Sequence, residues 1–77
     1  MGDAVRAVRT RAGEVVGLAA MHGAAGGIDT EGLRWALADA RLEPHETRGA
    51  SNEALGGRVV VRVREGRLLV VHERGLA

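Results

Sequence analysis

Four arginines lie close together in the C-terminal third of the chain: Arg58, Arg62, Arg64 and Arg67. They alternate with aliphatic residues, so in an extended hairpin they project from one face around one turn. Guanidinium groups contact phosphate oxygens in pairs, and a basic ribbon can hold a nucleic-acid backbone in this way. Two other interpretations remain open, a solvated strand face that blocks aggregation and a contact with an acidic protein. We predict nucleic-acid binding through these four side chains, to RNA, tRNA or DNA.

The charge distribution along the chain agrees with this hypothesis. The 77 residues carry a formal net charge of +1, and all 11 basic residues are arginine. Residues 48–77 hold 6 Arg and 3 Glu, a local charge of +3, whereas residues 1–47 hold 5 Arg and 7 acidic residues, a local charge of −2. The arginines have no aromatic neighbours on which bases could stack, so the pattern favours contacts to the phosphate backbone.

No other set of residues converges on a reaction. The histidines His22, His45 and His72 lie in three different segments, and none has the spacing of a helical metal site. The chain has no cysteine, which excludes a disulfide framework and a thiolate zinc site. We therefore expect no catalytic residue, no metal and no cofactor, and we predict that the chain is not an enzyme.

The hydrophobic core that this composition allows is small. Its apolar residues are almost all Ala, Val and Leu, and Trp35 is the only aromatic residue. Such cores bury little area per residue, so we expect a protein partner or self-association into a homo-oligomer. A protein-interaction or self-assembly module, such as a small subunit of a larger complex, is the alternative function. Six residues are candidates for its interface: Gly13, Gly17, Trp35, Val60, Leu69 and Val71.

Two helices are expected to precede the arginines, within residues 3–43. Apolar residues recur every three or four positions between Val5 and Ala19, and Gly26-Gly27 is a typical helix end. A second helix is predicted after Asp29 or Thr30, with Leu33, Ala36, Leu37 and Ala40 on its apolar face. Trp35 lies beyond the edge of that face, where it is either part of the core or exposed to a partner.

Two aliphatic runs then form an antiparallel β-hairpin over residues 58–74. A turn at Glu65-Gly66 pairs Val63 with Leu68, Val61 with Val70 and Val59 with His72, and these six residues form the core face. Residues 44–57 form a polar loop, which makes the fold winged-helix-like if residues 51–55 are helical. The predicted fold is a single α+β domain over residues 1–77. Because two strands alone make a poor sheet, we expect a third strand near Ile28 or pairing across a dimer.

The order of these elements resembles the small non-catalytic segment that follows the catalytic domain of bacterial tRNA(Ile)-lysidine synthetases. The matching residues are Gly26-Gly27, residues 30–42, Leu55-Gly56-Gly57-Arg58, and residues 62–71. The proline expected before the second Gly pair is absent, as is the family's nucleotide-binding Ser-Gly-Gly-x-Asp-Ser loop. The resemblance therefore implies contact with tRNA and no ATP-dependent activity.

The location of the protein is inferred from its apolar segments. The stretch from Val15 to Ala25 is apolar but shorter than the roughly 20 residues that a transmembrane helix needs. With the arginines before it, the stretch faintly resembles a secretory signal. We prefer a cytoplasmic protein without membrane contact.

Overall fold

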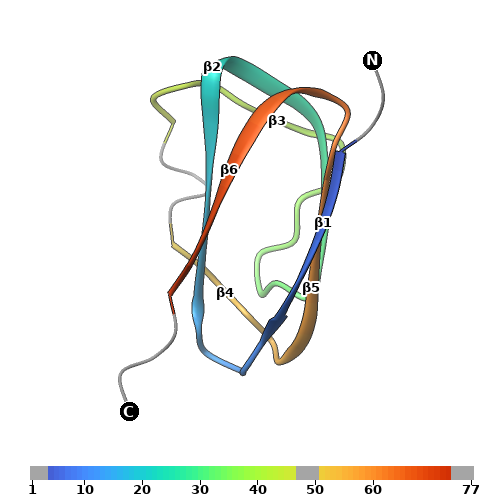
Figure 1. The fold of residues 1–77 in the computed structure, drawn as a ribbon, viewed down its shortest axis with the longest axis vertical. Helices are drawn as coiled ribbons and strands as arrows, with labels where there is room; N and C mark the ends of the chain where they lie inside the picture. Colours follow the sequence, from blue (N-terminus) through green and yellow to red (C-terminus); the bar gives the residue numbers. More distant parts are fainter. Residues whose placement is uncertain (1–3, 47–50, 74–77) are drawn as a thin grey trace.

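The computed structural model describes residues 4–46 and 51–73, and all the regular structure in these residues is β-strand (Figure 1). The six strands are β1 (Ala4–Thr10), β2 (Val15–Glu31), β3 (Ala40–Leu42), β4 (Asn52–Glu53), β5 (Gly57–Val63) and β6 (Glu65–Glu73). Since no helix occurs in the described residues, none there could cross a membrane.

The long strand β2 takes part in two layers (Figure 1). Its first half pairs antiparallel with β6 and β4, and its last three residues pair with β5, which pairs in turn with β1. The change of layer occurs between Met21 and Gly26, where the register with β6 shifts. His22 and Gly23 have positive φ angles of 59° and 119° within this segment. One continuous strand thereby lines both sides of the core.

The core is built from residues that alternate along the strands. Val16, Leu18 and Ala20 of β2 are buried in one layer, and Val59, Val61 and Val63 of β5 are buried in the other. Ile28 and Leu42 are fully buried beside them. Because alternate residues of a strand point to opposite faces, these aliphatic side chains share the space between the layers.

The two predicted helices are wrong. The first expected helix is divided between β1 and β2, and Gly26-Gly27 lies inside β2 rather than at a helix end. The second becomes the end of β2, a loop and β3. Ala favours a helix and Gly disfavours it, so their mixture leaves a weak net preference. Val favours strands, and pairing with β5 and β6 therefore outweighs a helical spacing. The α+β class, including its winged-helix-like form, is corrected to an all-β fold in the described residues.

The two aliphatic runs near the C-terminus are strands, as predicted, but they do not pair with each other. β5 pairs with β1 and β2, whereas β6 pairs with β2 in the other layer. Gly66 supplies the expected positive φ, at 83°, yet the turn carries the chain between layers. The predicted core face is confirmed for Val59, Val61 and Val63, while Leu68 and Val70 are half-buried against the same core.

Two further expectations concern the sheet and the polar segment. Ile28 lies in β2, which pairs with β5, so the expected third strand near Ile28 is present as part of β2. Residues 51–55 are not helical, because they contain β4 and a bridge from Ala54 to Leu33. Residues 47–50 of the predicted loop lie outside the described part of the chain.

Candidate functional site

The segment between β2 and β3 presents Trp35 at the surface. Gly32 begins this segment with a φ of +84°, and a side chain there would collide with the carbonyl oxygen of Arg58. The following residues run antiparallel to β4: the Arg34 N–H donates to the Glu53 carbonyl at 2.8 Å, and the Leu55 N–H donates to the Gly32 carbonyl at 2.9 Å. The segment is thus held by main-chain hydrogen bonds on one side.

Asn52 fixes the main chain of Trp35 directly. Its amide nitrogen donates to the Trp35 carbonyl at 2.7 Å, and its Oδ1 accepts the Trp35 N–H at 3.1 Å. The Asn52 residue is only 4% exposed. A buried amide that forms its hydrogen bonds holds its partner in place, because a buried polar group without a hydrogen bond lowers the stability of the fold.

Two residues near the end of β2 hold the rest of the segment. The Thr30 hydroxyl accepts the Leu37 N–H at 2.8 Å, and the Thr30 N–H donates to the Leu37 carbonyl at 2.9 Å. The Asp29 carboxylate accepts the Asp39 N–H at 2.7 Å and an Arg64 N–H at 3.2 Å. Residues 32–39 are therefore bound to both β2 and β4.

The Trp35 side chain remains exposed although its main chain is anchored. The residue is 53% exposed, and the Arg34 guanidinium carbon lies 5.1 Å from the centre of its ring system. Arg34 also lies 3.5 Å from a Glu53 carboxylate oxygen. An aromatic face, a cation and a carboxylate thus occupy one patch, which we call the Trp35 patch and define as Arg34, Trp35 and Glu53. This patch can hold a planar cationic ligand.

The four predicted arginines do not form one basic face. Arg58 and Arg62 belong to β5 and Arg67 to β6, which are in different layers. Arg64 forms ion pairs with Asp29 at 3.2 Å and Asp39 at 3.5 Å, so its charge is largely compensated. The ribbon expected from the alternation is absent because the two strands do not pair.

The six predicted interface residues are only partly brought together. Gly17 faces Val71 in the β2–β6 register, and Leu69 lies two residues away on the same outer face. Leu69 and Val71 are 47% and 45% exposed. Gly13 is in the turn before β2, Val60 is half-buried in β5, and Trp35 lies beside β4, so these three are separate from that surface.

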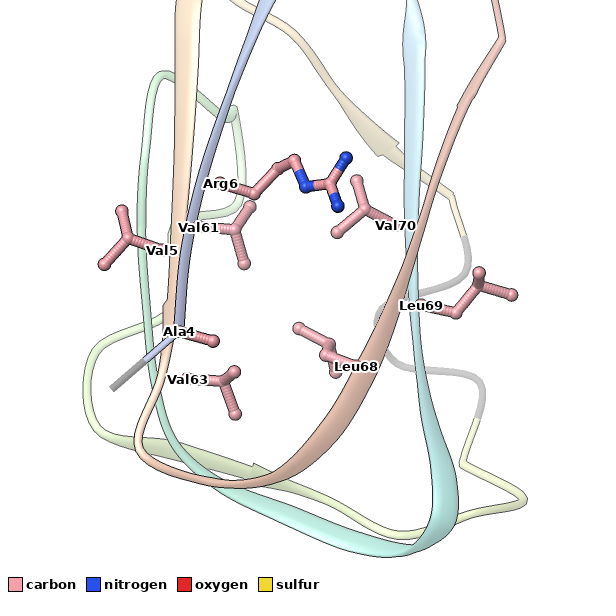
Figure 2. Close-up of a pocket in the computed structure, with 8 residues that line it drawn as sticks. All are labelled: Ala4, Val5, Arg6, Val61, Val63, Leu68, Leu69 and Val70. Atoms are coloured by element: carbon pink, nitrogen blue, oxygen red, sulfur yellow. The ribbon is translucent and has the colours of Figure 1, made fainter. Parts of the chain in front are cut away.

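A cleft of about 350 Å³ lies between the layers, where β1 and β6 face each other (Figure 2). Val61 and Val63 point into it from β5, and Leu68 and Val70 point into it from β6, whereas Val5 and Leu69 point away (Figure 2). Arg6 is the single charged residue of its lining. The other described residues that line the cleft are aliphatic.

One side-chain hydrogen bond joins the turn before β2 to the end of β6. The His72 Nε2 lies 2.8 Å from a Glu14 carboxylate oxygen, and both side chains are mostly buried. The Arg11 N–H, which donates to the Glu14 carboxylate, and then the His72 ring lower the pKa of Glu14 below its usual value. In the described residues no three His, Asp or Glu side chains meet in a way that could bind a metal.

Sequence reasoning missed the residues that anchor the segment 32–39. The sequence predicts a helix cap at Asp29 or Thr30 and a polar loop around Asn52. Thr30 and Asn52 are the two buried polar residues of the described chain. A short polar side chain ahead of the single tryptophan, and another within a polar segment, is too common a pattern to identify them.

Comparisons with known proteins agree with this fold. Residues 5–68 match the family described as the vitamin B1-binding domain of thiamin pyrophosphokinase. The crystal structure of thiamine pyrophosphokinase from Bacillus subtilis superimposes with a TM-score of 0.85 at 13% sequence identity. The superposition covers 99% of this chain and 36% of that one, so the chain spans about a third of the enzyme's length. A search of curated proteins finds no match.

These findings overturn two predictions from sequence. The resemblance to tRNA(Ile)-lysidine synthetase is wrong, because both the matching family and the similar structure are thiamin pyrophosphokinases. The nucleic-acid hypothesis is wrong for the same reason, and the alternative of an interaction or self-assembly module as its function has no support. The prediction that the chain is not an enzyme needs one qualification. The matching family is a binding domain, but it is the binding domain of an enzyme. The chain belongs to the vitamin B1-binding domain family of thiamin pyrophosphokinase.

Proposed function

We propose that this domain binds thiamin, vitamin B1, on the Trp35 patch and provides the vitamin-binding part of a pyrophosphokinase. The family match supports the choice of ligand, and one observation supports the choice of site: the single aromatic residue of the chain is exposed while its main chain is fixed by a buried amide. A fixed aromatic face binds a flat ligand with little loss of its own conformational entropy.

The chemistry of thiamin fits this patch. Thiamin consists of an aminopyrimidine ring and a positively charged thiazolium ring, so it needs an aromatic surface and a nearby negative charge. Arg34 already places a planar cation over the indole, and the Glu53 carboxylate lies beside that cation. The thiazolium ring takes the place of the guanidinium, since a cation over an indole is attracted to the negative face of its π system.

We do not assign the transfer of pyrophosphate to the described residues. The chain corresponds to 36% of the similar enzyme, and the Trp35 patch holds no phosphate-binding loop. We infer that groups beyond this domain bind the pyrophosphate donor, and that the domain holds the vitamin.

Fluorescence of the single tryptophan tests the proposal. Titration of the full chain with thiamin should change the Trp35 emission saturably, because stacking alters the indole environment. Trp35→Leu should weaken binding about fivefold in calorimetry, since cation–π contacts contribute on the order of 1 kcal/mol, whereas Trp35→Phe should retain part of the affinity. Val5→Ala, at another exposed apolar residue, is the matched control and should leave binding unchanged.

The contribution of the charged ring can be tested by itself. An N-methylated thiazolium should bind better than the corresponding neutral thiazole, because only the first carries the charge. Equal binding of thiamin by the Trp35→Leu and unmodified chains would show that the vitamin binds elsewhere and would contradict the assignment.

A further inference from the structure

One arginine of β1 lies on the inner side of its layer. Arg6 pairs with Val61 in the β1–β5 register, and Val61 is only 4% exposed. Directly opposite residues of an antiparallel pair share a face of the sheet, so Arg6 is on the core side. Its side chain extends from β1 into the cleft, towards Val70 (Figure 2). A charged group beside an apolar wall is favourable only with water or an anion as its partner.

No acidic side chain in residues 4–46 and 51–73 forms an ion pair with Arg6. Arg64, by contrast, has both Asp29 and Asp39 as partners. Within the described chain β1 pairs with β5 alone, and an inward charge on such an edge strand discourages pairing with another sheet. That protective role needs only the charge. The open apolar space beside Arg6 is a separate feature, and it points to a ligand.

The cleft has a charged end and an apolar end. Ala4 pairs with Val63 two positions before the Arg6 pair, and Leu68 lies across the cleft from them (Figure 2). These three aliphatic residues line the end near the turn into β6. The cleft measures about 350 Å³, whereas an apolar cavity of about 150 Å³ already holds a benzene-sized ligand. An aliphatic chain therefore fits in the apolar end while a polar head remains beside Arg6.

We propose that this cleft binds the anion of a medium-chain fatty acid. The alkyl chain lies against Ala4, Val63 and Leu68, and the carboxylate accepts two parallel hydrogen bonds from the Arg6 guanidinium. A carboxylate carries one negative charge, which the single arginine of the lining compensates. A phosphate ester carries about −1.5 to −2 and would leave charge uncompensated beside apolar side chains.

This site is independent of the proposed vitamin site. Its lining shares no residue with the Trp35 patch, and it lies between β1 and β6, whereas Trp35 lies beside β4. Loss of fatty-acid binding with thiamin binding retained, or the reverse, therefore separates the two proposals.

Calorimetric titration of the full chain with octanoate tests the binding. Octanoate should bind saturably at one site. Acetate has the carboxylate without the chain, and octanol has the chain without the charge. Each should bind at least about tenfold more weakly than octanoate, because each lacks one of the two contacts.

Substitution of Arg6 tests the charged end. Arg6→Gln should weaken octanoate binding at least about tenfold, and Arg6→Lys should weaken it less, because lysine keeps the charge without the planar fork. Arg9→Gln is the matched control, since it removes the same charge from the outer face of the same strand and should leave binding unchanged. Both arginines are exposed, so circular dichroism should show an unchanged fold, and thiamin titrations should be unchanged.

Nuclear magnetic resonance of the methyl groups tests the apolar end. Octanoate should shift the methyl resonances of Val63 and Leu68, which point into the cleft (Figure 2). Leu69 is the internal control, because it belongs to the same strand as Leu68 and points away from the cleft (Figure 2).

Three results would overturn the proposal. Equal binding of octanoate and octanol would show that Arg6 does not select an anion. Equal weakening by Arg6→Gln and Arg9→Gln would reduce the effect to general attraction between charges. Absence of octanoate binding, or methyl shifts confined to Leu69, would show that no fatty acid occupies the cleft.

Discussion

The Trp35 segment and the β1–β6 side of the molecule are ordered in different ways. Residues 32–39 have no regular structure, yet Asn52, Thr30 and Asp29 bind their main chain with short hydrogen bonds. The β1–β6 side consists of regular strands, yet its side chains enclose a cleft of about 350 Å³. Regular secondary structure is thus a poor guide to how closely a region is held together here. Specific polar contacts hold the exposed segment, whereas a cleft remains among the apolar side chains.

The largest effect should follow loss of the Asn52 amide. Asn52→Ala leaves the Trp35 N–H and C=O without their partners, so the free energy of unfolding should fall by about 2–3 kcal/mol. Urea denaturation followed by the fluorescence of Trp35 measures this change. Leu55→Ala removes the same number of heavy atoms from a residue that is 60% exposed, and it should change stability by less than about 0.5 kcal/mol. Equal losses in the two variants would show that the segment is not held by Asn52.

A pair of alanine substitutions should separate the closed core from the cleft. Ala25 is fully buried in β2, so Ala25→Val should cost about 1–3 kcal/mol through overpacking. Ala4 lines the cleft, so Ala4→Val should stay within about 0.5 kcal/mol of the unmodified chain. Thermal unfolding of the two variants compares them directly. A similar loss for both would mean that the β1–β6 side is packed as tightly as the rest.

The smallest effect should come from pH, through the Glu14 carboxylate, whose contact with His72 ties the turn before β2 to β6. Because the pKa of Glu14 is lowered in the folded protein, its contribution is present above its ordinary value of 4.5 and is lost as pH falls through the lowered pKa. The melting temperature of the unmodified chain should therefore drop as the pH falls below about 4.5. Glu14→Gln keeps the shape without the charge, and its melting temperature should depend less on pH in this range. An unchanged pH dependence in this variant would rule out the Glu14 contribution.

The amount of the fold that could be predicted differs between segments. The two strands at the C-terminus were predictable because their β-branched runs alternate with charges, and their inward residues are those expected from a period of two. Residues 3–43 were misassigned because the helix preference of Ala is opposed by the many Gly residues, and because spacings of three and four arise by chance. Of the candidate site, only Trp35 was singled out, as a residue for the core or for a partner.

The sequence by itself determined the local preferences: where β-branched runs form strands, where Gly66 allows a turn, and that one aromatic residue is available. The tertiary structure decided which strands pair, and so separated Arg58 and Arg62 from Arg67. It also brought Asn52 to Trp35 across 17 positions of sequence. Long-range pairing depends on the free energy of the whole core, in which many small residues contribute at once. A local sequence pattern does not report the free energy of the whole core. For this reason the sequence predicted a basic hairpin, whereas the chain has the β-fold of a vitamin-binding family.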